Sequence, residues 1–285
     1  LNYFSVADPS EIVIEDINSN LTEIIQSGQI LDLLIHKNNL YASYSNYSNI
    51  SNCQLLNIAV SNIESDYFEF NNLIIFDECQ NSSIQGGRLK PYIKDGNEGL
   101  LLTTSQNDSN FLNYKAQDDN SIYGKVLFID LNKKDYKVFA KGLRNPQGLF
   151  VKNDLIITTE HGPRGGDEIN KILQNKNYGW PVASYGEPYG EGYGNRNSEF
   201  LLKNYHKKSH SNYGYEEPLY VFVPAIGISE IINVPDKYHP KWNNNFLISS
   251  LGGRSIYRVK FDEDFNRVLL TEQIYIGRRI RDLIY

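Results

Sequence analysis

Short strand-like runs recur at intervals of about ten residues along almost the entire chain, and no other feature limits the fold more strongly. The runs are rich in β-branched and aromatic residues, and clusters of Asn, Asp, Gly, Ser or Lys separate them. Helical periodicity is nearly absent, because the one amphipathic candidate, residues 10–28, carries many β-branched residues that disfavour a helix. We therefore predict an all-β protein with strands over 11–17, 39–45, 55–61, 72–78, 99–105, 125–131, 136–142, 149–153, 154–160, 219–223, 230–234, 244–250, 255–261 and 268–276.

The number of predicted strands selects among the all-β architectures. A sandwich closes after about seven to nine strands, fewer than this chain offers. An outer-membrane barrel would need longer strands with one apolar, lipid-facing side, and the sequence lacks them. A four-stranded propeller blade takes about 40 to 50 residues, so 285 residues make about six blades. We therefore predict that residues 1–285 form a single six-bladed β-propeller domain, although no internal repeat is visible.

Charge and composition exclude several classes of partner. The net charge is -6, and acidic and basic residues are interleaved without a basic stripe, which disfavours nucleic acid. The apolar runs are too short to span a membrane. Two cysteines, Cys53 and Cys79, cannot make a metal site alone, and they leave a disulfide or two buried thiols as alternatives. The chain contains no Met, so we expect a processed or trimmed piece of a longer protein.

A stretch dense in charge and glycine follows directly on a predicted apolar strand. The sequence "TTEHGPRGGDEIN" covers residues 158–170, and we predict that it forms a loop at one mouth of the propeller channel. Backbone carbonyls beside Gly and Pro, with carboxylates nearby, are the ligands that calcium prefers. Arg144, Arg279 and Arg281 suit a planar polycarboxylate, which guanidinium groups bind with two hydrogen bonds. A cation and arginines at a channel mouth together predict an anionic cofactor.

Each Gly-rich motif also has a purely structural interpretation when it is taken alone. "GGRL" (86–89) can be a turn that leads into a strand, and "RNPQG" (144–148) can be a type I turn. "RRIRD" (278–282) can be a charged edge strand that discourages aggregation. Only the combination of motifs indicates a site.

In combination, these motifs resemble the soluble glucose/sorbosone dehydrogenase family. The resemblance is carried by "GGRL", "YGKVLFIDL", "GLRNPQGL", "TEHGPRGGDEIN", "NYGWP" and "RRIRDL", and residues 123–181 are its most specific part. The family consists of aldose sugar dehydrogenases on a six-bladed propeller that depend on pyrroloquinoline quinone (PQQ). The resemblance therefore implies a PQQ- and calcium-dependent protein that oxidises a sugar at its anomeric carbon. It also implies a periplasmic or secreted location and a monomer or homodimer.

The resemblance implies roles for individual residues at the cofactor and metal positions. Gln29 matches a glutamine near the sugar, Arg144 and Asn145 match a pair that contacts the quinone, and Arg279 and Arg281 match the arginines that hold the cofactor carboxylates. Gly162 and Pro163 match the loop whose carbonyls bind the calcium under the cofactor, and His161 lies beside them. A second, structural calcium in some members uses positions that correspond to Ala183, Tyr185 and Glu187.

The general base of the family is missing at its usual position. The family motif begins with a histidine before "GGRL", and Ile84 stands there in this chain. Loss of a general base costs about 10²- to 10⁴-fold in rate. Gln106 replaces the aspartate that orients the base, and Gly252 replaces a lysine that anchors the cofactor. A usually aromatic segment has also become aliphatic at Val223 and Ile228.

These departures leave two functional hypotheses. In the first, the chain is a sugar dehydrogenase that works without the usual base, or with His161 as a relocated base. In the second, it is a catalytically silent propeller that serves as a ligand-binding or structural protein. We expect the remaining histidines to lie at the surface or to pack against neighbours; they are His36, His206, His210 and His239.

The resemblance also bears on the ends of the chain and on one variable loop. The match begins partway into the first blade of the family and stops before the strands that usually complete the last one. Either the sequence is trimmed and its closing blade is incomplete, with unpaired backbone at the seam, or the ring closes differently. The Tyr- and Gly-rich residues 184–197 are expected to form a specificity loop or an oligomer contact.

Overall fold

The computed structural model of the chain describes residues 2–8, 11–16, 18–25, 27–106, 115–187, 206–235, 240–242 and 244–284. Strands make up nearly all of its regular structure, so the predicted all-β class is confirmed. The strands are β1 (Asn2–Asp8), β2 (Glu11–Asp16), β3 (Gln29–His36), β4 (Asn39–Ser48), β5 (Cys53–Asn62), β6 (Asn71–Ile75), β7 (Gly86–Lys94), β8 (Asn97–Thr104), β9 (Lys125–Asp130), β10 (Asp135–Lys141), β11 (Pro146–Lys152), β12 (Leu155–Glu160), β13 (Asp167–Lys171), β14 (Tyr220–Phe222), β15 (Ile228–Asn233), β16 (Asn245–Ser250), β17 (Ser255–Phe261) and β18 (Val268–Tyr275).

Helix is confined to short turns in the described part of the chain. The α-helix α1 covers only Leu21–Ile24, and two 3₁₀ turns cover His210–Tyr213 and Pro240–Trp242. The amphipathic candidate over residues 10–28 therefore contains strand β2 and one helical turn, as its β-branched content indicated. No helix in these described ranges is long and apolar enough to cross a bilayer.

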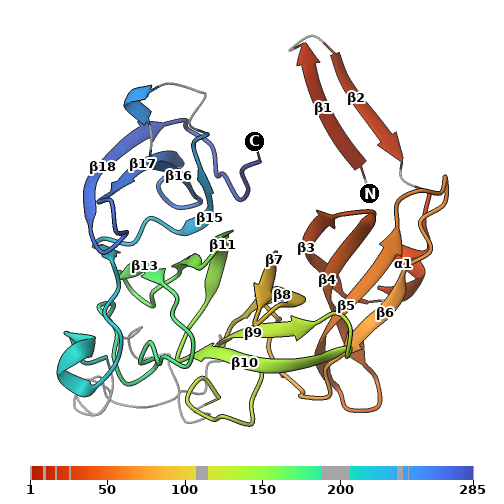
Figure 1. Cartoon of the computed structure of the whole chain (residues 1–285), viewed down its shortest axis with the longest axis horizontal. Helices are drawn as coiled ribbons and strands as arrows, with labels where there is room; N and C mark the ends of the chain where they lie inside the picture. The colour runs from red at the N-terminus through yellow and green to blue at the C-terminus, as the bar shows by residue number, and fades with distance from the viewer. Residues whose placement is uncertain are drawn as a thin grey trace. The chain divides into compact units, whose positions relative to one another are not determined.

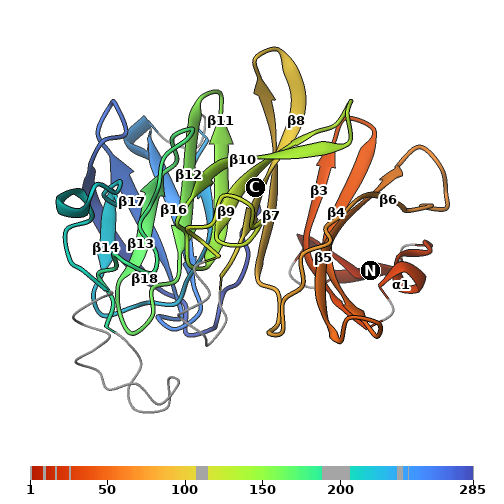
Figure 2. The ribbon, with the colours of Figure 1, turned by 90° about the horizontal axis from the view of Figure 1, so that it is seen from below.

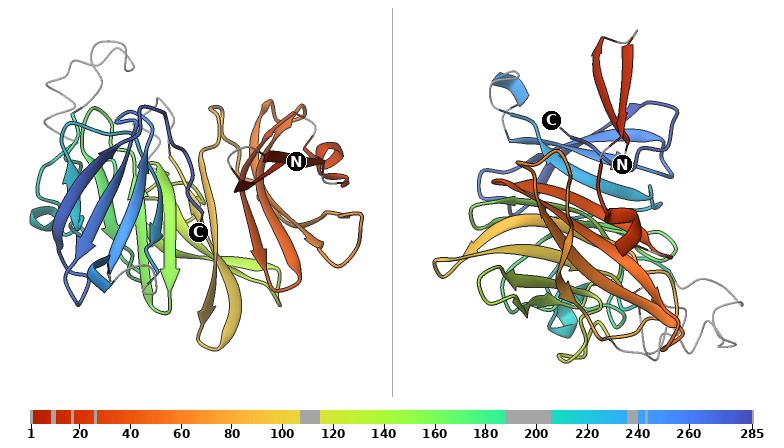
Figure 3. Two further views of the ribbon diagram at one scale, coloured as in Figure 1. Left: turned by 90° about the horizontal axis from the view of Figure 1, so that it is seen from above. Right: turned by 90° about the vertical axis from the view of Figure 1, so that its right-hand side faces the viewer.

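The strands belong to two compact units, residues 1–79 and residues 80–285. In the first unit, antiparallel strands β3 to β6 form one sheet in chain order, and β1 pairs with β2 in a separate hairpin (red to orange in Figure 3). The buried side chain of Leu21 in α1 packs with Leu40 and Phe70 in the core of this unit. Cys53 and Cys79 form a disulfide, so the disulfide alternative holds and the free-thiol alternative does not. Closing a loop of this length stabilises a fold by about 3 kcal/mol.

The second unit contains three antiparallel four-stranded sheets, each a meander in chain order: β7 to β10, β11 to β14 and β15 to β18 (Figures 1 and 2). The first strand of every meander is an edge strand, and β11 packs beside both β7 and β15. Meanders whose first strands face one another have the pattern of propeller blades. The first unit contains one more four-stranded meander, so the described residues hold four of them, and the total of six blades stays a prediction.

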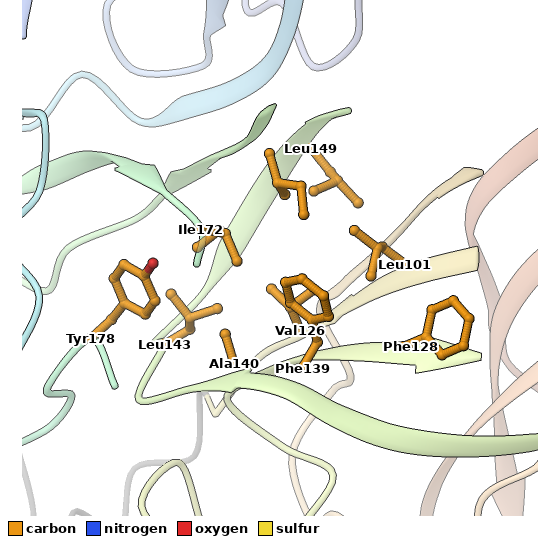
Figure 4. Close-up of a cluster of buried hydrophobic side chains, with 10 residues drawn as sticks. Leu101, Val126, Phe128, Phe139, Ala140, Leu143, Leu149, Ile172 and Tyr178 are labelled. Atoms are coloured by element: carbon orange, nitrogen blue, oxygen red, sulfur yellow. The ribbon is translucent and has the colours of Figure 1, made fainter. Parts of the chain in front are cut away.

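Two apolar clusters join the three sheets of the second unit. The first cluster includes Leu101, Phe139 and Leu149, and it lies between the first and second sheets (Figure 4). The second cluster includes Ile157 and Phe246, and it lies between the second and third sheets. Each fully buried side chain of this size contributes about 1.5–3 kcal/mol, so the packing of the sheets fixes where their first strands end. Those strand ends carry the candidate site.

Strand β7 shows why some strands escape prediction from the sequence. Its residues include two glycines and Pro91, which disfavour a central strand. Because β7 is an edge strand, Pro91 can pair with Leu100 of β8 without disturbing a second neighbour. Position in the sheet, rather than composition, makes this segment a strand.

Candidate cofactor site

A chain of side-chain hydrogen bonds connects several predicted cofactor residues at the ends of β7 and β11. The guanidinium group of Arg281 donates to Gln147 Oε1 at 3.2 Å. Gln147 Nε2 donates to Asn145 Oδ1 at 2.7 Å, and Asn145 Nδ2 donates to Gln85 Oε1 at 2.8 Å. The structure thus brings Asn145 and Arg281 into one network, although they are far apart in the sequence. The network ends at Gln85, the neighbour of Ile84.

Arg144 lies beside this network and points at the polar loop after β12. Its guanidinium group donates to the carbonyl oxygens of His161 at 2.8 Å and Gly162 at 3.0 Å. The same group lies over the ring of Trp180, with 5.3 Å to the ring centroid. The backbone N–H of Arg144 donates to Glu160 at 3.0 Å. Arg144 is therefore buried and held on several sides.

An ion-pair network centred on the buried Arg88 holds the segment after β18 against the other sheets. Arg88 of β7 contacts Glu230 of β15 at 3.1 Å and Asp282 at 2.9 Å, and its Nε donates to the carbonyl of Gln147 at 2.7 Å. Burial raises the pKa of Glu230 to about 7, and the Arg88 guanidinium opposes that rise. The carbonyl oxygen of Arg281 accepts a hydrogen bond from the Arg88 guanidinium at 3.5 Å. One arginine therefore ties the backbone that carries Arg281 to the first strands of three sheets.

The polar loop is shorter than the sequence indicated. Residues 158–170 were predicted as one loop, but Glu160 ends β12 and residues 167–171 form strand β13. Asp167 is buried, and its carboxylate accepts hydrogen bonds from the backbone N–H groups of Gly162, Ile226 and Ile228, each at 3.0 Å. Its role is to fix the loop of residues 161–166 rather than to face a ligand.

Two glutamates of the stretch are paired across strands inside the protein. Glu160 lies opposite Glu168 in the register of β12 and β13, and both are buried. Burial, together with the charge of Glu168, raises the pKa of Glu160, and burial raises the pKa of Glu168 to about 7. Like charges directly opposite each other disfavour double ionisation, so these carboxyls titrate as a pair. Glu160 and Glu168, two of the charged residues of this stretch, therefore lie inside the protein and not at its surface.

His161 begins the loop of residues 161–166 and lies next to the amide network. Its backbone N–H donates to the carbonyl of Asn145 at 3.0 Å, which joins the loop to the amide network. Burial lowers the pKa of the imidazole, and the charge of Asp167 opposes this fall. The ring is therefore neutral near pH 7, and it lies on the loop side of Arg144.

The residues at the positions that depart from the family motif have structural surroundings of their own. Ile84 is 1% exposed and is part of the apolar interior. Gln106 is buried, and its Oε1 accepts the backbone N–H of Ala116 at 2.8 Å. A Cβ atom at Gly252 would lie 2.9 Å from the carbonyl oxygen of Ile226, so the backbone there leaves no room for a lysine. Val223 is exposed, whereas Ile228 is fully buried in β15.

The remaining predicted residues lie in different surroundings. Arg279 is exposed, in the segment between β18 and Arg281. Pro163 is buried in the loop, and Gln29 is exposed at the start of β3 in the other unit. The metal positions implied by the resemblance, Ala183, Tyr185 and Glu187, lie together in one turn after Trp180. Residues 188–197 of the predicted specificity loop lie outside the described residues.

The chemistry of these groups fits the two implied ligands unequally. The exposed guanidinium groups of Arg279 and Arg281 are suitable donors for a polycarboxylate such as PQQ, and Gln147 links Arg281 to the amide of Asn145. The carbonyl of Gly162, by contrast, already accepts a guanidinium N–H from Arg144. A calcium ion at that oxygen would stand next to the buried positive charge of Arg144, which opposes its binding. In the residues that the structure describes, no three His, Cys, Asp or Glu side chains form a metal-binding group.

Three residues of the network, Gln85, Arg88 and Gln147, were not among the predicted site residues. Arg88 and Gln147 lie inside the motifs "GGRL" and "GLRNPQGL", and both are buried. The sequence position of a charged or amide side chain beside glycines does not reveal its contact partner. Their roles follow only from the approach of β7, β11 and β15.

Comparison with known proteins places the chain in a family. A family model described as Glucose / Sorbosone dehydrogenase matches residues 13–284. The chain therefore belongs to the glucose/sorbosone dehydrogenase family. It is 28% identical to the aldose sugar dehydrogenase YliI of Escherichia coli over 216 residues, which cover 70% of this chain and 53% of that protein. It is 26% identical to quinoprotein glucose dehydrogenase B of Acinetobacter calcoaceticus over 267 residues, covering 70% of this chain and 56% of that protein.

The solved structures agree with the fold. The soluble aldose sugar dehydrogenase of Escherichia coli, in its apo form, superimposes with a TM-score of 0.75 at 20% sequence identity, covering 99% of this chain and 82% of that chain. The sheet architecture is therefore shared. The chain spans about half the length of the curated relatives that it matches.

Titration of His206 is expected to weaken the fold in acid. Its ring is buried, contacts the carbonyl of Gly186 at 3.2 Å and packs edge-on against Trp180. Burial lowers its pKa to about 4, whereas the unfolded chain has the ordinary value near 6.5. Its contribution is therefore complete above pH 6.5 and is lost as pH falls through 4, about 3 kcal/mol in all. Urea unfolding at about pH 7.5 and about pH 4 measures this loss.

The matched control for this prediction is His206→Gln, which cannot titrate in that range. The wild type is expected to lose about 3 kcal/mol more than the variant between the two pH values, because all other groups are shared. Equal losses in the two proteins would show that His206 is not buried as a neutral ring.

Proposed function

We propose that this chain is a PQQ-dependent aldose sugar dehydrogenase-like protein, which oxidises a sugar at its anomeric carbon when it turns over. The observation that carries the proposal is the hydrogen-bonded chain from Arg281 through Gln147 to Asn145, beside Arg144. This arrangement gathers positive charge and amide donors at the ends of the first strands. The membership of the family and the quinoprotein name of one relative support it.

The residues of the chain would bind and orient the ligands. Arg279 and Arg281 would hold the carboxylates of the quinone, and Asn145 would donate a hydrogen bond to it. Bound PQQ would supply the hydride acceptor. Gln29 is proposed to contact the sugar, because the resemblance places a sugar-contacting glutamine at that position. A periplasmic or secreted location belongs to the same proposal.

The charge of Arg144 opposes the calcium site that the resemblance implies. Gly162 and Pro163 are the proposed ligands, yet Arg144 supplies a positive charge to the same carbonyl oxygen. Two cations close to each other in a buried site repel by several kcal/mol, on the order of 4 kcal/mol per pair of unit charges at 4 Å. We therefore propose that quinone binding, rather than calcium binding, is the feature of the family that this chain retains most directly.

A specific observation favours a second candidate function, a ligand-binding propeller without turnover. Ile84, at the position of the base, is fully buried, and Gln106 is committed to the backbone of Ala116. An aliphatic side chain cannot accept the proton that must leave the sugar hydroxyl. His161 is the alternative acceptor, and its neutral ring is compatible with that role.

Binding of PQQ tests the proposal without requiring turnover. We expect the wild type to bind one PQQ, and Arg281→Gln to weaken binding about 10- to 100-fold because a charge-assisted hydrogen bond to a carboxylate is lost. Isothermal titration calorimetry measures both constants. Arg278→Gln is the matched control, because Arg278 is an exposed neighbour that is not a proposed ligand. Equal affinities for all three proteins, or no binding, would contradict the proposed site.

A further inference from the structure

The turn of residues 183–187 already contains a cation that belongs to the chain. The ammonium group of Lys208 donates to the carbonyl oxygens of Ser184 at 3.3 Å, Tyr185 at 3.0 Å and Gly186 at 2.9 Å. It also forms an ion pair with Glu187 at 3.0 Å. Four oxygen atoms from consecutive residues therefore surround one ammonium group.

We propose that Lys208 is the resident cation of this turn and that it replaces a divalent metal there. Tyr185 and Glu187 are two of the three positions at which the family resemblance implied a structural calcium, and both contact Lys208 instead. Calcium requires about six to eight oxygen ligands at 2.3–2.6 Å. The same carbonyl oxygens cannot approach a metal ion this closely while they accept hydrogen bonds from the ammonium group.

The remaining contacts of the turn are also made by the chain. The backbone N–H of Ser184 donates to the carbonyl of Lys207 at 3.0 Å, and Gly186 N donates to Ser184 Oγ at 3.2 Å. The ring of His206 contacts the carbonyl of Gly186. The segment of residues 206–208 therefore binds the turn through backbone, ring and ammonium contacts together.

This turn supports the loop of the candidate cofactor site. Arg164 and Glu187 exchange two backbone hydrogen bonds, at 3.0 and 2.9 Å. The loop and the turn pack so closely that a Cβ atom at Gly166 would lie 2.3 Å from the backbone nitrogen of Gly186. Gly166 also has a φ of +69°, which favours glycine. Lys208 is thus a positioning residue for residues 162–166, through the turn that it holds.

The proposal has a consequence that does not depend on quinone or sugar. The turn should keep its structure when divalent metals are removed, and it should loosen when the ammonium group is removed. Amide hydrogen exchange of Ser184, Gly186 and Glu187 reports on the turn, and exchange of Arg164 reports on the loop, because these N–H groups make the bonds described above.

The experiment measures hydrogen exchange by mass spectrometry in peptides that cover residues 162–166 and 183–187. In Lys208→Ala, we expect exchange in both peptides to become about tenfold faster, since hydrogen bonds to a charged group are lost. Lys152→Ala is the matched control, because Lys152 is exposed at the end of β11. It removes the same charge and should leave both peptides unchanged. Lys208→Arg, which keeps a positive charge, should retain most of the protection.

The wild type provides a second arm that requires no variant to fold. After treatment with EDTA, the wild-type turn should exchange as slowly as it does before treatment. If the EDTA-treated wild type exchanges as fast as Lys208→Ala, a metal holds the turn and the proposal is wrong. If Lys208→Ala leaves both peptides protected, Lys208 does not hold the turn and the proposal is likewise wrong. Neither result depends on whether the chain binds PQQ.

Discussion

Replacement of Ile84 with histidine is expected to raise the rate of aldose oxidation by the PQQ-loaded protein about 10²- to 10⁴-fold, the usual contribution of a general base. Ile84 lies directly before Gln85, which ends the amide chain from Arg281 and Asn145. A histidine there would place a proton acceptor beside the proposed quinone position. Its imidazole is close in size to the isoleucine side chain, so the buried site can accept it. Dye-linked turnover with a panel of aldoses measures the gain.

The pH profile separates base catalysis from a change in packing. In Ile84→His, the rate should rise with pH through the histidine pKa, near 6.5 when unperturbed. Ile84→Asn is the matched control, because asparagine is polar and similar in size but does not accept a proton in this range. Addition of Gln106→Asp to Ile84→His should raise the rate further, because the family resemblance implies that an aspartate at this position orients the base. Equal rates for the histidine and asparagine variants would contradict the assignment of position 84.

Replacement of Arg88 with methionine is expected to destabilise the fold by about 3–5 kcal/mol at pH 8, because it leaves the buried carboxylate of Glu230 without its partner. Glu230 is 2% exposed, so water cannot take over the role of the guanidinium. The same substitution frees Asp282 and the carbonyl of Arg281 from the network. We therefore also expect weaker PQQ binding in this variant. Urea unfolding measures the loss of stability.

The dependence of this loss on pH identifies Glu230 as its source. Burial raises the pKa of Glu230 to about 7, so the group is protonated at about pH 5.5. A neutral carboxyl costs less to leave unpaired, and the destabilisation by Arg88→Met should be smaller there than at about pH 8. Arg267→Met is the matched control: Arg267 is exposed and pairs with Asp262, so its loss should cost less than about 1 kcal/mol. A loss of that size in Arg88→Met would contradict the network.

The sequence was sufficient for the fold wherever strands follow their own composition. Every predicted strand has its counterpart, from residues 11–17 in β2 to residues 268–276 in β18. Strands β1, β3, β7 and β13 were not predicted. Strand β7 was missed because it contains proline and glycine, and β13 because most of its residues are charged. Both depend on tertiary context: β7 lies at a sheet edge, and Asp167 at the start of β13 is satisfied by three backbone N–H groups.

The candidate site divides in a similar way. Motif order pointed to Arg144, Asn145 and Arg281, and the structure brings the last two together through Gln147. The sequence could not show that Arg88 connects three sheets, because the contact partners come from β11, β15 and the segment after β18. It also could not show that Lys208 reaches the turn of residues 183–187.

Turnover of the wild type with bound quinone tests the central claim most directly, because that claim combines a retained quinone site with a missing proton acceptor. The protein would be saturated with PQQ, and the rate of dye reduction would be measured with aldoses in the presence and absence of calcium. We expect stoichiometric quinone binding and a rate about 10²- to 10⁴-fold below that of Ile84→His. A wild-type rate equal to that of the histidine variant, or a protein that does not bind the quinone, would contradict the account.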